Sequence, residues 1–82
     1  MGYGHYHVSL VTKDVKLNEL IIFEEYGAHL VQEWSTDKTL DTFENIQDAV
    51  TFAVKYLKNK YNGEILRGAG CPPDRMLEEA EK

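Results

Sequence analysis

Two histidines near the amino terminus are the residues of this chain best suited to metal chemistry. His5 and His7 are two positions apart. In a β-strand, side chains so spaced point to one face, with Cα atoms about 7 Å apart. Two imidazoles in that arrangement hold a transition metal once a third ligand joins them, and His29 or Cys71 is the candidate for that place. The alternative is that both histidines lie on the solvent face of an edge strand.

A second group of residues combines carboxylates with aromatic rings. Tyrosine and tryptophan are frequent anchors of protein interfaces, and carboxylates favour a partner with a basic surface. Solvated charges that keep strand edges from aggregating explain the acidic members equally well. The predicted partner-binding residues are Glu24, Glu25, Tyr26, Glu33, Trp34 and Asp37.

The sequence contains no recognisable catalytic constellation, so we expect that the protein is not an enzyme and uses no cofactor. Cys71 is the only cysteine, and no base or oxyanion site for a nucleophile is evident near it. Glu24 and Glu25 are adjacent in an expected strand, so they face opposite ways and cannot act as one acid–base pair. The stretch 68–70, Gly-Ala-Gly, lacks the rest of a phosphate-binding loop.

The charge balance indicates the kind of partner to expect. The 82 residues carry a net charge of -5, and the basic residues are scattered, which disfavours direct binding to nucleic acid. The amino terminus lacks the features of a secretion signal, and no window approaches the roughly 20 apolar residues of a membrane span. With a single cysteine and no possible internal disulfide, the expected location is the reducing cytoplasm.

These residues must be positioned by a small fold, and alternation of apolar residues predicts its strands. The expected strands cover about residues 5–12, 18–26, 28–35 and 39–43, with a hairpin turn near Gly27. A helix over residues 16–35 is the alternative, because its apolar residues also share a broad helical face. Adjacent branched and aromatic residues and Gly27 favour strands.

An amphipathic helix is predicted over residues 46–61. Apolar residues recur there at spacings of three and four, which marks one buried face. Asn45 is the expected N-cap, and Gly63 is expected to close the helix at its carboxyl end. Residues 64–66 are a candidate for one further short strand.

The predicted fold class is α+β: a small antiparallel sheet of three or four strands packed on one amphipathic helix. A short carboxyl-terminal helix is expected over residues 73–81, with proline in its first turn. Residues 1–66 are expected to form the single α+β domain, residues 67–73 a connector, and residues 74–82 a short helix or a frayed tail.

These features together predict a non-enzymatic protein-binding module, a small acidic inhibitor or adaptor that acts through its exposed hairpin on another protein with a basic surface. The alternative is a metal- or small-ligand-binding protein that uses His5 and His7, alone or in a homodimer. Pairing of edge strands between two copies would produce such a homodimer.

Overall fold

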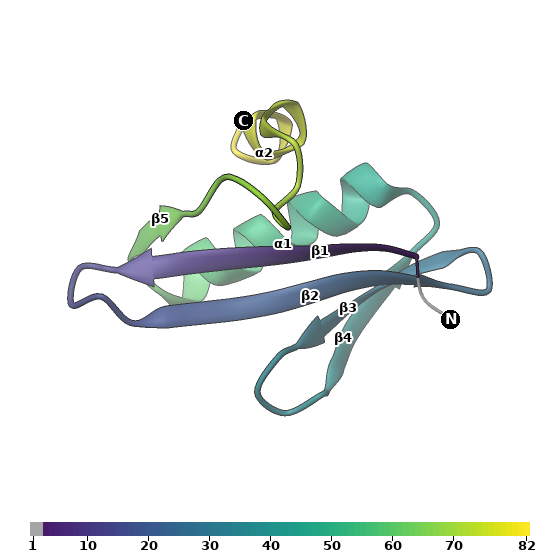
Figure 1. Cartoon of the computed structure of the whole chain (residues 1–82), viewed down its shortest axis with the longest axis horizontal. Helices are drawn as coiled ribbons and strands as arrows, with labels where there is room; N and C mark the ends of the chain where they lie inside the picture. Colours follow the sequence, from purple (N-terminus) through teal and green to yellow (C-terminus); the bar gives the residue numbers. More distant parts are fainter. Residues whose placement is uncertain (1–2) are drawn as a thin grey trace.

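A five-stranded antiparallel sheet and two helices make up the part of the chain that the computed structural model describes, which is residues 3–82, with side chains from residue 6 onward. The sheet order is β4-β3-β2-β1-β5 (Figure 1). The structure confirms the α+β class, with one strand more than the predicted three or four. The elements are β1 (Tyr3–Thr12), β2 (Leu17–Glu25), β3 (Ala28–Glu33), β4 (Thr39–Phe43), α1 (Ile46–Lys60), β5 (Gly63–Ile65) and α2 (Asp74–Ala80).

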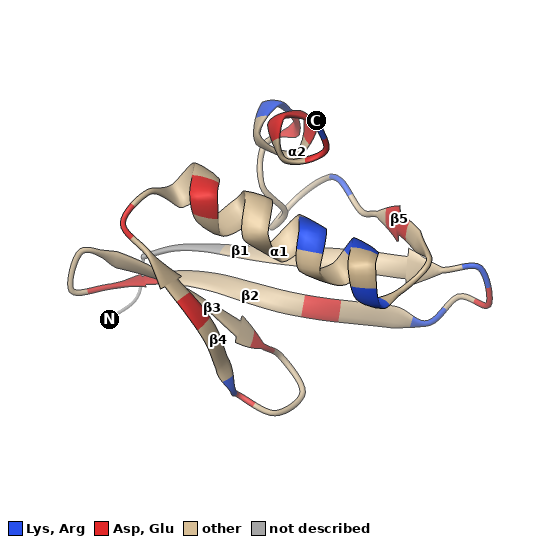
Figure 2. Cartoon of the chain, turned by 180° about the vertical axis from the view of Figure 1, so that it is seen from behind, with Lys and Arg blue, Asp and Glu red and all other residues tan. Residues whose placement is uncertain are grey.

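The core lies between one face of the sheet and α1. Strand register places Val8 opposite Leu20 and Ile22 opposite Val31. Directly opposed residues of antiparallel strands share a face, so these side chains form one apolar surface. All are buried, together with Leu10, because α1 lies across this face (Figures 1 and 2).

The β2–β3 hairpin shows that the segment predicted as either strands or a helix forms strands. Its two-residue loop consists of Tyr26 and Gly27, whose φ angles are 53° and 79°. Positive φ at both central positions is the geometry of a type I′ turn, whose twist matches that of the flanking strands. Glycine reaches this region without steric cost, whereas tyrosine does so unfavourably.

Helix α1 begins as predicted and ends differently. The Asn45 side chain accepts a hydrogen bond of 2.7 Å from the backbone N–H of Gln47, which confirms the N-cap. The predicted role of Gly63 as the residue that closes the helix is wrong. Tyr61 is the C-cap, and Gly63 is the first residue of β5, paired with Thr12. A Cβ atom at Gly63 would collide with the Val11 carbonyl oxygen, so strand packing explains the glycine.

The segment after β5 is attached to the sheet and to α1. Backbone hydrogen bonds from Leu66 to Ser9 and from His7 to Gly70 hold residues 66–70 along the edge of β1. Helix α2 then packs on α1 and buries Leu77 and Ala80 in the same apolar cluster as the sheet residues. Arg67 adds ion pairs to three carboxylates of this region, those of Asp74, Glu78 and Glu81.

The sheet face turned away from α1 carries a mixed surface. Figure 1 looks onto this face, and within the described residues neither helix lies over it. Ile21, Phe23 and Leu30 are half-buried there, and Trp34 is exposed beside them. Neither helix of the described chain has the length and apolar character required to span a membrane.

Candidate functional site

The predicted partner-binding residues fall into two groups at opposite ends of β3. Glu24, Glu25 and Tyr26 lie at the β2–β3 turn, whereas the other three lie where β3 ends and turns toward β4. Strand β3 runs from one group to the other, and the five steps from Ala28 to Glu33 correspond to roughly 16 Å by strand rise. They therefore form two distinct surfaces, which we call the hairpin tip (residues 24–26) and the β3 end (residues 33–37).

The hairpin tip presents an aromatic ring between carboxylates. Tyr26 is 98% exposed, the most exposed of the large hydrophobic residues of the described chain. Glu25 pairs with Ala28 and is exposed, and Glu24 pairs with His29 and is half-buried. The two glutamates alternate across the strand, so one carboxylate lies on each side of the hairpin behind the ring.

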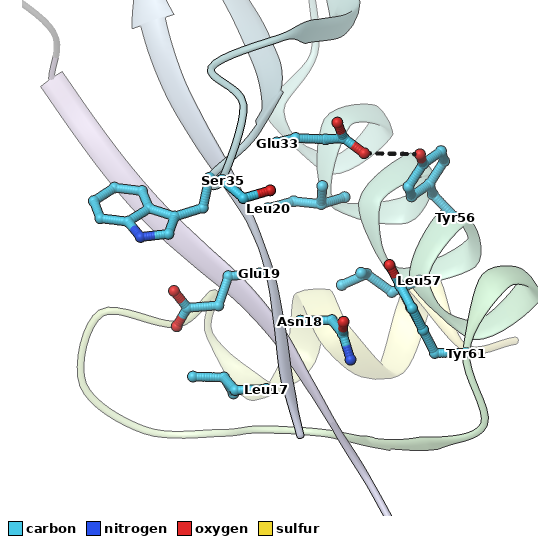
Figure 3. A pocket seen from close by; sticks show the side chains of 10 residues that line it. Leu17, Asn18, Glu19, Leu20, Glu33, Ser35, Tyr56, Leu57 and Tyr61 are labelled. Carbon is cyan, nitrogen blue, oxygen red and sulfur yellow. Dashed lines mark hydrogen bonds between the residues drawn. The ribbon is translucent and has the colours of Figure 1, made fainter. Parts of the chain in front are cut away.

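A groove lies beside the β3 end, and we call it the β2-edge groove. Its volume is about 430 Å³, and it is formed by the first half of β2, the end of β3 and the last turns of α1 (Figure 3). Two of the predicted residues, Glu33 and Trp34, line it. The other lining residues used below are Leu17, Asn18, Glu19, Leu20, Tyr56 and Tyr61.

Glu33 is the electrostatic centre of this groove. Its carboxylate accepts hydrogen bonds of 2.9 Å from the Thr36 hydroxyl and 3.2 Å from the Tyr56 hydroxyl. The Thr36 hydrogen bond is the largest cause that lowers the pKa of Glu33. Partial desolvation opposes it, while Tyr56 and the charges of Lys60 and Lys38 add to the lowering. Glu33 is therefore a fixed negative charge near neutral pH.

Lys60 lies against the same wall of the groove. Its Nζ is 3.8 Å from Oε2 of Glu33 and donates a hydrogen bond of 3.3 Å to the Tyr56 hydroxyl. It also lies 5.4 Å from the ring centre of Tyr56 and 5.9 Å from that of Tyr61. These contacts raise the pKa of Lys60, first through the Tyr56 hydrogen bond. The Glu33 carboxylate and the rings of Tyr56 and Tyr61 thus already bind one cation, the ammonium group of Lys60.

Trp34 and Asp37 differ in their surroundings. The Trp34 ring lies 5.4 Å from the ring of His7, between centroids, on the sheet face away from α1. Asp37 is exposed in the β3–β4 turn with a φ of 57°, a conformation that aspartate tolerates better than most residues. Its backbone N–H donates to the Glu33 carbonyl, so Asp37 shapes the turn beside the groove.

Of the two histidines predicted to bind a metal, the structure describes the side chain of one. The His5 side chain lies outside the described residues, and His7 packs on Trp34. Among the described side chains, no three His, Cys, Asp or Glu residues come together as a metal site. A metal site that uses both histidines stays a prediction.

Cys71 is half-buried near the edge of β1. Burial, and to a smaller extent the nearby Glu19 carboxylate, raises the pKa of the Cys71 thiol. Activated cysteines have a lowered pKa, so the surroundings of Cys71 favour the unreactive thiol.

Sequence reasoning missed several residues of the groove, chiefly Glu19, Tyr56 and Tyr61. The tyrosines carried a signal, because they are aromatic residues near the end of an amphipathic helix with lysines around them. Nothing in the sequence placed Glu19 in the same groove as the tyrosines, since the groove depends on where β3 stops pairing with β2.

Comparison with known proteins adds no assignment to this geometry. The chain matches no protein-family model, no curated protein and no solved structure.

Proposed function

We propose that this chain is a non-enzymatic protein-binding module, a small inhibitor or adaptor whose contact surface is the hairpin tip. The observation that carries the proposal is Tyr26, a ring that is 98% exposed at the apex of the hairpin. Tyrosine contributes large contact area at low entropic cost, and a protruding ring fits a pocket on a partner. The flanking Glu24 and Glu25 favour a partner with a basic surface.

The backbone at Tyr26 supports the same proposal. Type I′ turns favour Asn-Gly, because asparagine tolerates positive φ better than an aromatic residue. The chain has the glycine at position 27 and a tyrosine before it, at a φ of 53°. A residue that is unfavourable for folding and fully exposed is typical of a position used for binding.

A position-specific crosslink tests this proposal. Benzoylphenylalanine, a photoreactive aromatic residue, replaces Tyr26 in one sample and Val15 in another, and both are irradiated in an extract of the cells that encode the protein. Val15 is a matched control, because it is 81% exposed and has a φ of 60° in a different turn. We expect an adduct from position 26 and none of the same mass from position 15.

The charge of the partner is tested in the same assay. Glu24→Gln and Glu25→Gln together, or raised salt, should weaken the adduct from position 26, because both reduce attraction to a basic surface. Equal adducts from positions 15 and 26, or an adduct unaffected by salt and by both substitutions, would contradict the proposal.

A further inference from the structure

Strand β2 extends beyond the strand that pairs with it. The register of β3 on β2 begins at Leu20 opposite Glu33, whereas Leu17, Asn18 and Glu19 pair with β1. The Trp34 N–H donates a long hydrogen bond of 3.3 Å to the Glu19 carbonyl, and the chain then turns away toward β4. In the described structure, the first residues of β2 therefore form an open edge beside the β2-edge groove.

The backbone groups at this edge point into the groove. Successive peptide groups of a strand point to opposite edges, so residues two apart point the same way. The Glu19 carbonyl points away from β1, since it accepts from Trp34. The N–H and C=O of Leu17 consequently point to the same side, where an added strand would find them.

The side chains that line the groove lie on both faces of the sheet. Leu17 and Glu19 point to one side of β2, and Asn18 and Leu20 point to the side of Tyr56 and Tyr61 (Figure 3). An extended peptide beside β2 alternates its own side chains between the same two sides. This arrangement is that of strand addition, in which backbone hydrogen bonds supply affinity and alternate side-chain sites supply specificity.

The chemistry of the groove indicates the side chain that it accepts. Glu19 and Glu33 are acidic, and of the described residues that line the groove none is basic. On the α1 side, the Glu33 carboxylate and the rings of Tyr56 and Tyr61 already hold the Lys60 ammonium. The Lys60 side chain is 51% exposed, so it can move into solvent when another cation takes this place.

We propose that the β2-edge groove binds an extended segment of another protein by strand addition to β2, with a Lys or Arg side chain of that segment against Glu33 and the two tyrosine rings. This site is separate from the hairpin tip, and the proposal does not depend on that one. Backbone pairing with Leu17 sets the position of the segment, and the Glu33 carboxylate selects a basic residue.

A peptide titration tests the proposal directly. The probes are Ac-Thr-Val-Lys-Val-Thr-NH₂, the same peptide with glutamate in place of lysine, and the lysine peptide with its backbone amides N-methylated. Trp34 is the single tryptophan, so its fluorescence reports the groove, and amide NMR shifts locate the contact. We expect millimolar binding of the lysine peptide with shifts at Leu17, Glu19 and Trp34.

The two comparison peptides separate the parts of the proposal. The glutamate peptide should bind at least about fivefold more weakly because its central side chain meets the Glu33 carboxylate. N-methylation should abolish binding because it removes the backbone donors while it keeps the charge. Saturating binding of the N-methylated peptide, equal binding of the acidic and basic peptides, or no shift with the lysine peptide at millimolar concentration would overturn the proposal.

Two matched pairs of variants test whether the lysine peptide binds in the β2-edge groove. Leu17→Pro removes the edge N–H together with the side chain, and Leu17→Ala removes only the side chain, so Leu17→Pro should bind the lysine peptide several-fold more weakly. Glu33→Gln should weaken binding, and Glu64→Gln, at the exposed position of β5, should not. Thermal melts verify that each variant folds. Equal binding within each pair, or shifts that depend on protein concentration without peptide and so reveal pairing of two copies here, would overturn the proposal.

Discussion

The hydroxyl of Tyr56 donates a hydrogen bond of 3.2 Å to Oε2 of Glu33, which joins the last turns of α1 to the end of β3. The two residues are 23 positions apart in the sequence. Because Glu33 also accepts from Thr36 in the following turn, the contact fixes the position of that turn relative to α1. It is therefore both a structural link and one wall of the β2-edge groove.

Removal of this hydroxyl should cost little stability and should loosen the β3 end. Tyr56→Phe keeps the ring and deletes two hydrogen bonds, the one donated to Glu33 and the one accepted from Lys60. We expect the Tm to fall by a few degrees, as for the loss of partly exposed hydrogen bonds. Tyr61→Phe is the matched control, since its hydroxyl has no hydrogen-bond partner among the described residues. Calorimetry of both variants measures the difference, and equal Tm values would contradict a stabilising contact.

The lowered pKa of Glu33 predicts a dependence of stability on pH. A carboxyl group whose pKa is lower in the folded protein contributes stability above its unfolded pKa of about 4.3, and this contribution is lost as the pH falls through the folded pKa. The Tm of the natural protein should therefore exceed that of Glu33→Gln at pH near 7, and the difference should shrink as the pH falls below about 4. Thermal melts at several pH values measure it, with Glu64→Gln as the control. A difference that grows on acidification would contradict the lowered pKa.

Two exposed residues with positive φ should be replaceable with a gain in stability. Tyr26→Asn places asparagine at a φ of 53° in the type I′ turn, and Val15→Asn relieves a branched residue at a φ of 60°. We expect each to raise the free energy of unfolding by about 0.5–1 kcal/mol, because asparagine reaches this region more easily. Gly27→Ala is the opposite case, and should lower it by about 1 kcal/mol, since nothing but the φ of 79° opposes the added methyl group.

Urea denaturation measures all three turn variants. Whether Tyr26→Asn raises or lowers the free energy of unfolding shows whether the Tyr26 ring contributes to the fold. A loss of stability would mean that the ring makes a folded-state contact, which would contradict its 98% exposure.

Helix α2 should be an integral part of the folded domain and not a frayed tail. Leu77 is fully buried against α1, so Leu77→Ala should lower the free energy of unfolding by about 2–4 kcal/mol, as for other buried leucines. Arg75→Ala, at an exposed position of the same helix, should change it by less than about 0.5 kcal/mol. Denaturation curves compare the two variants. Equal effects would show that α2 does not contribute to the core.

The sequence determined the elements and their order, because the signals for them are local. Alternation of apolar residues located β1 to β4, the three-and-four spacing located α1, and Asn45 marked its start, each within a few residues of the observed bounds. These patterns reflect which side chains a single strand or helix must bury. Gly63 shows where local reasoning fails: a glycine after a helix is typical of a cap, and here the approach of β1 requires it.

Only the tertiary structure decided how the candidate site is divided. The sequence grouped Glu24 and Tyr26 with Glu33 and Trp34 because they are close along the chain, but β3 separates the two pairs. Conversely, Glu19 and Tyr56 are far apart in sequence and line one groove. Strand register, strand length and helix packing bring residues such as Glu19 and Tyr56 into one groove. All three depend on contacts between residues distant in the sequence, which no local pattern encodes.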